Sequence, residues 1–270
     1  MRACATLRLM VVVDSHCHAS REWYEPIETL LFEMDRYGVE QAVLIQINGQ
    51  YDNRYQAECA RRYPGRLASV VLVDARQPDA PRTLERLAAE GASGVRLHPT
   101  ARSPGDEPLA IWRTAERLGL AVSCGGSSAD FLQPEFAALL EAVPGARIVL
   151  EHLGGLSRPD DNERRARVFE LARFANVFIK VTGLGEFARR AMPVKAPLPF
   201  EEPVPDYLEQ AYRAFGPGRM LWGSDFPPVA GREGYGRALR GCQDWFADKP
   251  AEDIARIFGE TARSVFPIRG

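Results

Sequence analysis

Short runs of apolar, mostly β-branched residues alternate along this chain with longer amphipathic segments rich in alanine, leucine, arginine and glutamate. Apolar runs of this length predict strands that are buried on both faces, and the amphipathic segments predict helices. We expect strands at residues 10–14, 42–47, 67–73, 94–98, 121–124, 147–151, 177–181 and 220–224. We expect helices at 26–37, 52–63, 81–90, 107–118, 134–142, 162–174, 203–215 and 233–247, with a last one at 251–265.

This alternation predicts a parallel sheet, because strands that are separated by helices pair through right-handed crossovers. Eight such units within roughly 250 residues are typical of a (β/α)8 TIM barrel. A doubly wound open sheet is the alternative, but no GxGxxG or P-loop motif follows the first predicted strand. We therefore predict an α/β fold, a single TIM-barrel domain over residues 10–270 with a lead-in segment at residues 1–9.

A proline-rich segment, MPVKAPLPFEEPVP, interrupts the pattern at residues 192–205. Its five prolines prevent it from joining the sheet. Because it follows the seventh strand, we expect it over the carboxyl ends of the strands, where it could shape a substrate pocket. The alternative is a loop without a role.

Composition excludes several classes of partner. The 270 residues carry a formal net charge of −2, which favours neither nucleic acid nor an anionic membrane surface. No apolar run approaches the ~18 residues that a membrane helix requires. The five cysteines form no CxxC pair, which is typical of free thiols in a reducing compartment. We expect a cytoplasmic protein with a small-molecule substrate.

All four histidines follow predicted strands. His16 and His18 follow the first strand, His98 ends the fourth and His152 ends the sixth, while Asp225 follows the eighth strand. The active sites of TIM barrels lie at the carboxyl ends of the strands. The sequence therefore predicts that these side chains share one face of the barrel.

The stretch VVVDSHCH suggests a metal site. His16 and His18 are two residues apart, so on a strand both point to the same side. Two neutral imidazoles and the Asp225 carboxylate would suit Zn²⁺ or another divalent ion such as Mn²⁺. Asp14 lies on the same side and could orient an imidazole.

The motifs DSHCH, GVRLHP, EHLGG, FIKVTG and WGSDFP, in this order, resemble the amidohydrolase-related family called amidohydrolase 2. The resemblance covers residues 11–266, and the family includes sugar-acid and dicarboxylate lactonases and aminocarboxymuconate-semialdehyde-type decarboxylases. It implies a metal-dependent TIM-barrel enzyme, often a homodimer. It also implies that His16, His18 and Asp225 are metal ligands and that His152 is the catalytic histidine.

The fifth strand departs from the family pattern. It reads LAVSCGGSS, with Cys124 and Gly125 where many members carry a ligand histidine. Cys124 could bind Zn²⁺ as a thiolate, or it could simply be buried. Some lactonase-like members also lack this histidine, and part of that group works without metal. The resemblance therefore favours a lactonase and leaves metal-independent operation open.

Several other polar residues have two interpretations. Arg96 could pair with a substrate carboxylate or form a buried ion pair, and His98 could contact substrate or close the fourth strand. Glu151 is adjacent to His152, so we expect it to point toward the helices. Lys180 is expected in a buried salt bridge rather than in catalysis, and Trp222 in the core.

These observations predict a hydrolase that acts on a lactone or another ester of a small carboxylated or sugar-acid compound. A bound divalent ion would acidify the attacking water, Asp225 would accept its proton and His152 would polarise the carbonyl. The alternative is a non-oxidative decarboxylase of an aromatic or muconate-like carboxylate. A barrel that only binds a ligand would not require this cluster.

Overall fold

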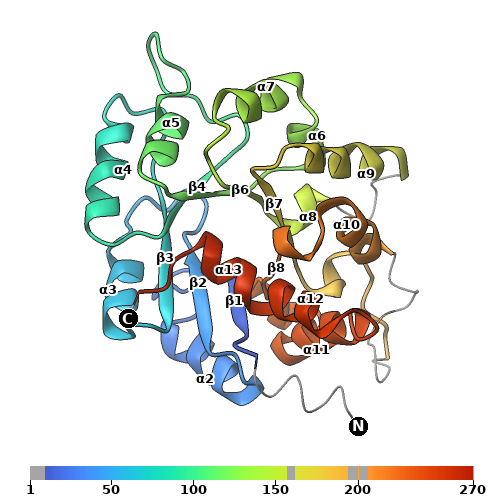
Figure 1. The fold of residues 1–270 in the computed structure, drawn as a ribbon. Helices are drawn as coiled ribbons and strands as arrows, with labels where there is room; N and C mark the ends of the chain where they lie inside the picture. Colours follow the sequence, from blue (N-terminus) through green and yellow to red (C-terminus); the bar gives the residue numbers. More distant parts are fainter. Residues whose placement is uncertain (1–9, 157–161, 194–199, 201–205, 270) are drawn as a thin grey trace.

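Eight parallel strands form the centre of the molecule in this computed structural model, which describes residues 10–156, 162–193, 200 and 206–269. They hydrogen-bond in sequence order, β1 to β8. The strands are β1 Val13–Cys17, β2 Gln41–Ile45, β3 Leu67–Leu72, β4 Gly94–Leu97, β5 Ala121–Cys124, β6 Ile148–Leu150, β7 Val177–Val181 and β8 Met220–Trp222. Helices surround them (Figure 1), so the predicted single-domain TIM barrel is confirmed.

The helices lie close to the predicted positions. They are α2 Ile27–Tyr37, α3 Arg54–Arg62, α4 Ala80–Ala89, α5 Ala110–Arg117, α6 Ser128–Phe131, α7 Pro134–Ala142, α8 His152–Gly155, α9 Asn162–Phe169, α10 Tyr207–Phe215, α11 Tyr235–Trp245, α12 Ala251–Ala255 and α13 Thr261–Val265. The predicted last helix is one run, in which the π-helical turn η6 Arg256–Glu260 joins α12 to α13. The lead-in at 1–9 and most of the 192–205 segment lie outside the described residues.

The barrel closes through backbone hydrogen bonds at its carboxyl end. The amide of Asp225 donates to the carbonyl of His16 (2.7 Å), and the amide of His18 donates to the carbonyl of Phe226 (2.8 Å). Strand β1 therefore runs further along the chain than the predicted 10–14, because its pairing continues past the apolar run. These bonds place DSHCH directly beside GSDFP.

Side chains point alternately to the two faces of each strand and so form two separate apolar layers. Val13, Val43 and Val70 point into the barrel, where Phe266 packs against them. A larger apolar layer fills the space between the barrel and the helices, and it contains the predicted core residue Trp222. The inside of the barrel is therefore apolar at one end, which leaves polar side chains at the carboxyl end of the strands.

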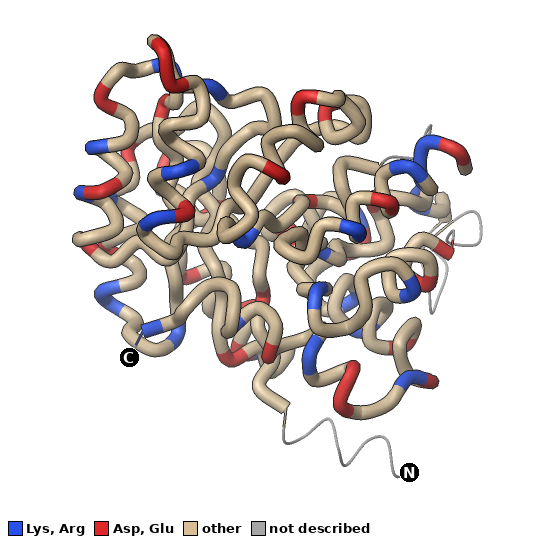
Figure 2. The backbone as a smooth tube through the Cα atoms, turned by 45° about the horizontal axis from the view of Figure 1, so that its top comes forward, with Lys and Arg blue, Asp and Glu red and all other residues tan. Residues whose placement is uncertain are grey.

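Charged residues of both signs are interspersed along the outer helices in the view of Figure 2. Several form local pairs, such as Arg86 with Glu90 on α4 (2.7 Å). Within the described part of the chain, no helix has the length and apolar character needed to cross a membrane.

Candidate active site

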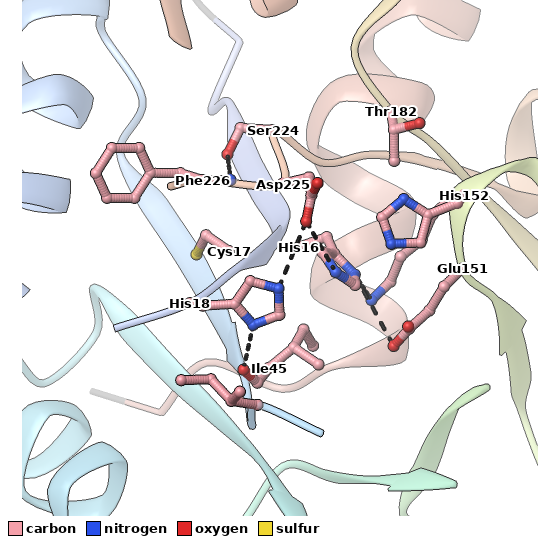
Figure 3. Close-up of polar contacts among 12 residues, drawn as sticks. His16, Cys17, His18, Ile45, Glu151, His152, Thr182, Ser224, Asp225 and Phe226 are labelled. Atoms are coloured by element: carbon pink, nitrogen blue, oxygen red, sulfur yellow. Dashed lines mark hydrogen bonds and ion pairs between the residues drawn. The ribbon is translucent and has the colours of Figure 1, made fainter. Parts of the chain in front are cut away.

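The structure brings His16, His18, His152 and Asp225 together at the carboxyl end of the barrel (Figure 3). The Nε2 atoms of His16 and His18 lie 3.7 and 3.5 Å from Asp225 Oδ1. The ring of His152 lies 4.9 Å from that of His16, centroid to centroid. Above these groups is a cavity of about 580 Å³, which His18, His152 and Asp225 help to line.

Asp14 holds the two motifs together. Its carboxylate accepts hydrogen bonds from the Ser224 amide (2.8 Å) and hydroxyl (2.6 Å), and from the Tyr235 hydroxyl (3.0 Å). Burial raises the pKa of Asp14, against the effect of these hydrogen bonds. The expectation that Asp14 orients an imidazole is wrong. The strand register shifts between Asp14 and Cys17, and the carboxylate faces Ser224, just after β8, and Tyr235 at the start of α11 instead.

Removal of one of these bonds should destabilise the barrel closure. We expect Tyr235→Phe to lower the free energy of unfolding by about 2 kcal/mol, because a buried carboxylate loses a hydroxyl donor. Urea unfolding measures this. The control, Tyr51→Phe at an exposed position, should change it by less than about 0.5 kcal/mol. Equal effects of the two substitutions would contradict this role of Asp14.

Two site residues have left-handed backbone conformations. Asp225 has φ of 57° and His152 has φ of 50°, which cost about 1–3 kcal/mol each for residues other than glycine. Asp225 lies a few positions after the end of β8, and its left-handed conformation turns the carboxylate toward the histidines. Strain of this kind is concentrated at functional sites.

His152 is paired with Glu186, a residue that the sequence analysis missed. His152 Nδ1 lies 2.9 Å from Glu186 Oε1, and the Thr182 hydroxyl donates to Glu186 Oε2 (2.8 Å). Burial lowers the pKa of His152, but the charge and hydrogen bond of Glu186 outweigh burial and raise it to about 9. His152 is therefore an imidazolium at neutral pH, and its Nε2–H is a strong hydrogen-bond donor.

Asp225 is held by Arg232, which the sequence analysis also missed. Arg232 Nη1 donates to Asp225 Oδ2 (2.9 Å), so Oδ1 is the oxygen that faces the histidines. Burial raises the pKa of Asp225, but His18, His152 and Arg232 together bring it below its usual value. The site thus combines an ionised carboxylate with a protonated imidazole.

The floor of the site is a buried polar network. Arg96 forms a two-point ion pair with Glu151 (3.1 and 2.7 Å), and Ser123 donates to the same carboxylate (2.7 Å). Burial favours the neutral acid, but Arg96 and Lys180 lower the pKa of Glu151 to about 2. Burial also lowers the pKa of Lys180, to about 8, while Glu151 opposes that shift.

The prediction that Glu151 points toward the helices is wrong. It assumed that the strand continues through His152, so that adjacent side chains take opposite faces. Strand β6 ends at Leu150, and the left-handed turn at His152 sends both side chains into the barrel mouth. Lys180 is buried as predicted, but its amine contacts Ser123 and His16.

Three predicted residues lie around this cluster in different ways. Arg96 lines the cavity while it pairs with Glu151. His98 is half-exposed, with Nδ1 2.7 Å from Thr100 Oγ1, and lines a neighbouring cavity of about 460 Å³. Cys124 is buried in the layer between barrel and helices, where burial raises its pKa well above the usual value. The structure thus does not bring Cys124 or His98 to Asp225.

Three side chains have the spacing that a divalent ion requires. One ligand atom each of His16, His18 and Asp225 lies within 4.8 Å of the others. His18 donates from Nδ1 to the Ile45 carbonyl (2.7 Å), a contact that leaves Nε2 available as a ligand. His16 Nε2 is buried, and within the described part of the chain it has no hydrogen-bond partner. These residues therefore match a metal site in spacing and in type of ligand atom, provided that His16 Nε2 carries no proton.

Comparison with known proteins identifies the family. The family model described as amidohydrolase matches residues 13–268. The chain belongs to the amidohydrolase family. It is an enzyme, a hydrolase, as the four histidines and Asp225 at one face of the barrel led us to expect.

One curated relative of this amidohydrolase is the L-fucono-1,5-lactonase of Burkholderia ambifaria. The two are 29% identical over an alignment of 284 positions, which covers 93% of each chain. An amidohydrolase from Burkholderia multivorans, solved with bound zinc, has a TM-score of 0.76 at 21% identity, over 96% of this chain and 99% of that one. A Pseudomonas putida protein described as a candidate 2-pyrone-4,6-dicarboxylic acid hydrolase has a TM-score of 0.74 at 22% identity, over 96% and 98%. The two structures support the fold.

Proposed function

We propose that this enzyme hydrolyses an uncharged, polyhydroxylated lactone, with Asp225 as the base and His152 as the electrophile. The observation that carries the proposal is the pairing of an ionised carboxylate with an imidazolium at one cavity. Opposite protonation states in two neighbouring titratable groups are characteristic of acid–base catalysis. The 29% identity with an L-fucono-1,5-lactonase supports the same reaction class.

The chemistry follows from these two side chains. Asp225 Oδ1 would accept a proton from water as the water oxygen forms a bond to the lactone carbonyl carbon. The Nε2–H of His152 would stabilise the negative charge that develops on the carbonyl oxygen. The ring C–O bond then breaks and the leaving oxygen takes the proton from Asp225, which gives a hydroxy acid.

A divalent ion, Zn²⁺ or Mn²⁺, would be held by His18 and Asp225, and by His16 if its Nε2 were free of a proton. When bound, it would supply a more acidic water and a further positive charge for the carbonyl. The steps above are those that the side chains of this chain perform themselves: Asp225 moves the proton, and His152 binds the oxyanion.

The walls of the cavity favour an uncharged substrate. Tyr24, Asn48 and Gln50 supply neutral hydrogen-bonding groups, and Trp23, 75% exposed, supplies an aromatic face. The guanidinium of Arg96 is already neutralised by Glu151, which leaves little positive charge for a substrate carboxylate. Hydroxyl groups and C–H faces of a sugar lactone match this lining better than a dicarboxylate.

A substrate panel tests this proposal. L-fucono-1,5-lactone and other aldonolactones should be opened with kcat/KM at least 100-fold above that for 2-pyrone-4,6-dicarboxylate. Proton release, corrected for spontaneous opening, reports hydrolysis, and CO2 release from aromatic carboxylates reports decarboxylation. A preference for the dicarboxylate would overturn the substrate class. Release of CO2 without lactone hydrolysis would overturn the reaction and favour the decarboxylase.

A further inference from the structure

Lys180 makes an unusual contact for a residue beside a histidine pair of this kind. It lies within β7, fully buried, and its Nζ is 2.9 Å from His16 Nδ1 and 2.7 Å from the Ser123 hydroxyl oxygen. Metal-binding histidines instead direct their second ring nitrogen at a carboxylate or a carbonyl. His18 follows that rule with the Ile45 carbonyl, but His16 does not.

The hydrogen-bond directions around Lys180 determine where His16 carries its proton. Ser123 donates to Glu151 Oε1, so its oxygen accepts from Lys180. A lysine ammonium has only donors, so Nδ1 of His16 must accept as well. A neutral imidazole has one N–H, and in His16 it is therefore on Nε2.

The second ring nitrogen of His16, Nε2, can still form a hydrogen bond. Nε2 is buried, has no hydrogen-bond partner among the residues that the structure describes, and faces Asp225 Oδ1 at 3.7 Å. A buried N–H without an acceptor costs about 1–3 kcal/mol, so a site that retains it gains when a ligand oxygen arrives. That oxygen would lie beside Asp225 and His152, where the reaction takes place.

We propose that Lys180 is a positioning residue that fixes His16 as an Nε2–H donor to the reacting oxygen and withholds the Nε2 lone pair from a metal ion. The role as donor to the reacting oxygen rests on the proposed function, whereas the position of the proton does not. His16 and His18 then differ in kind: His18 can present a lone pair to the site, and His16 presents a hydrogen.

Glu151 is the residue that would take over if Lys180 were removed. Its Oε1 lies 3.9 Å from His16 Nδ1. Without the ammonium, this carboxylate becomes the natural acceptor for an Nδ1–H. The proton of His16 would then move to Nδ1, which frees Nε2 and creates the carboxylate–histidine–metal arrangement.

The substitution Lys180→Met tests the proposal on the whole enzyme. Nitrogen-15 NMR of the imidazoles should show an Nε2–H tautomer for His16 in the wild type and an Nδ1–H tautomer in Lys180→Met, with the signal assigned by its loss in His16→Gln. Zinc affinity, measured by equilibrium dialysis, should rise about 10–100-fold in Lys180→Met. The turnover number should fall with little change in KM.

Lys249→Met is the matched control, because it removes a partly buried lysine that pairs with Glu209 (2.8 Å) rather than with a histidine. It should leave the tautomer and the zinc affinity unchanged. An Nδ1–H tautomer of His16 in the wild type would overturn the proposal without any substitution at Lys180, and so would equal zinc affinity in a folded Lys180→Met. Neither readout needs a substrate, so a failure of the lactonase proposal would not affect them.

Discussion

Asp225→Asn should reduce kcat/KM for lactone opening by about 10³-fold or more, since it removes the group that takes the proton from water. Asparagine keeps the volume of the side chain and adopts the left-handed conformation that residue 225 requires (φ 57°). We therefore expect a folded protein with nearly the same thermal midpoint. Proton release by the purified variant, corrected for spontaneous opening, measures the loss.

The control for this substitution is Asp248→Asn, which removes an acidic side chain that is 75% exposed. Its activity should match that of the wild type. If Asp225→Asn keeps more than a tenth of the wild-type kcat/KM, Asp225 is not the base, and the direction of proton transfer in the proposal is wrong.

Glu186→Gln should lower the turnover number by about 100-fold and shift the pH profile. Glu186 raises the pKa of His152, so the active imidazolium is present at neutral pH and is lost as the pH rises through about 9. Without this carboxylate the pKa falls, and activity should be lost at a lower pH. The pH dependence of kcat measures this shift of the alkaline limb.

Glu233→Gln provides the comparison for Glu186. Glu233 also contacts Arg232, and its Oε1 accepts from the Gly185 amide, but it does not touch His152. We expect the alkaline limb of the pH profile of kcat for Glu233→Gln to stay close to that of the wild type. An unchanged alkaline limb in Glu186→Gln would show that the titration of His152 does not control the reaction.

Much of the fold could be predicted from the sequence, because each buried strand is a short apolar run. The strands at 121–124 and 177–181 have the expected bounds. Strand β1 differs, since it closes the barrel beside the residues that follow β8, where Asp14 accepts hydrogen bonds from Ser224 and Tyr235, rather than through apolar residues. Contacts between residues more than 200 positions apart leave no local pattern.

The site was predicted in part. Histidines and an aspartate at strand ends are a local signal, so His16, His18, His152 and Asp225 could be identified. The directions of Ser123 and Cys124 could also be predicted, because side chains alternate along a strand. Ala121 faces the barrel interior, so Ser123 does too, and Cys124 faces the helices.

Other residues of the site had no such signal. Glu186 lies in the short 3₁₀ turn η3 Leu184–Glu186 after β7, and Arg232 follows the 3₁₀ turn η5 Pro228–Gly231. Side chains in irregular segments can point anywhere, because no period fixes their direction. The left-handed turn at His152, which reversed the expected direction of Glu151, is equally invisible in the sequence.

If water activated by Asp225 attacks the carbonyl carbon of a sugar lactone, an oxygen atom from the solvent enters the new carboxylate. Opening of L-fucono-1,5-lactone in oxygen-18 water, over a time in which spontaneous opening is negligible, shows where this atom goes. We expect one heavy oxygen in the carboxylate of the product and none in the hydroxyl released from the ring. Label in the ring hydroxyl, or no enzyme-dependent product, would contradict attack by water on the carbonyl carbon.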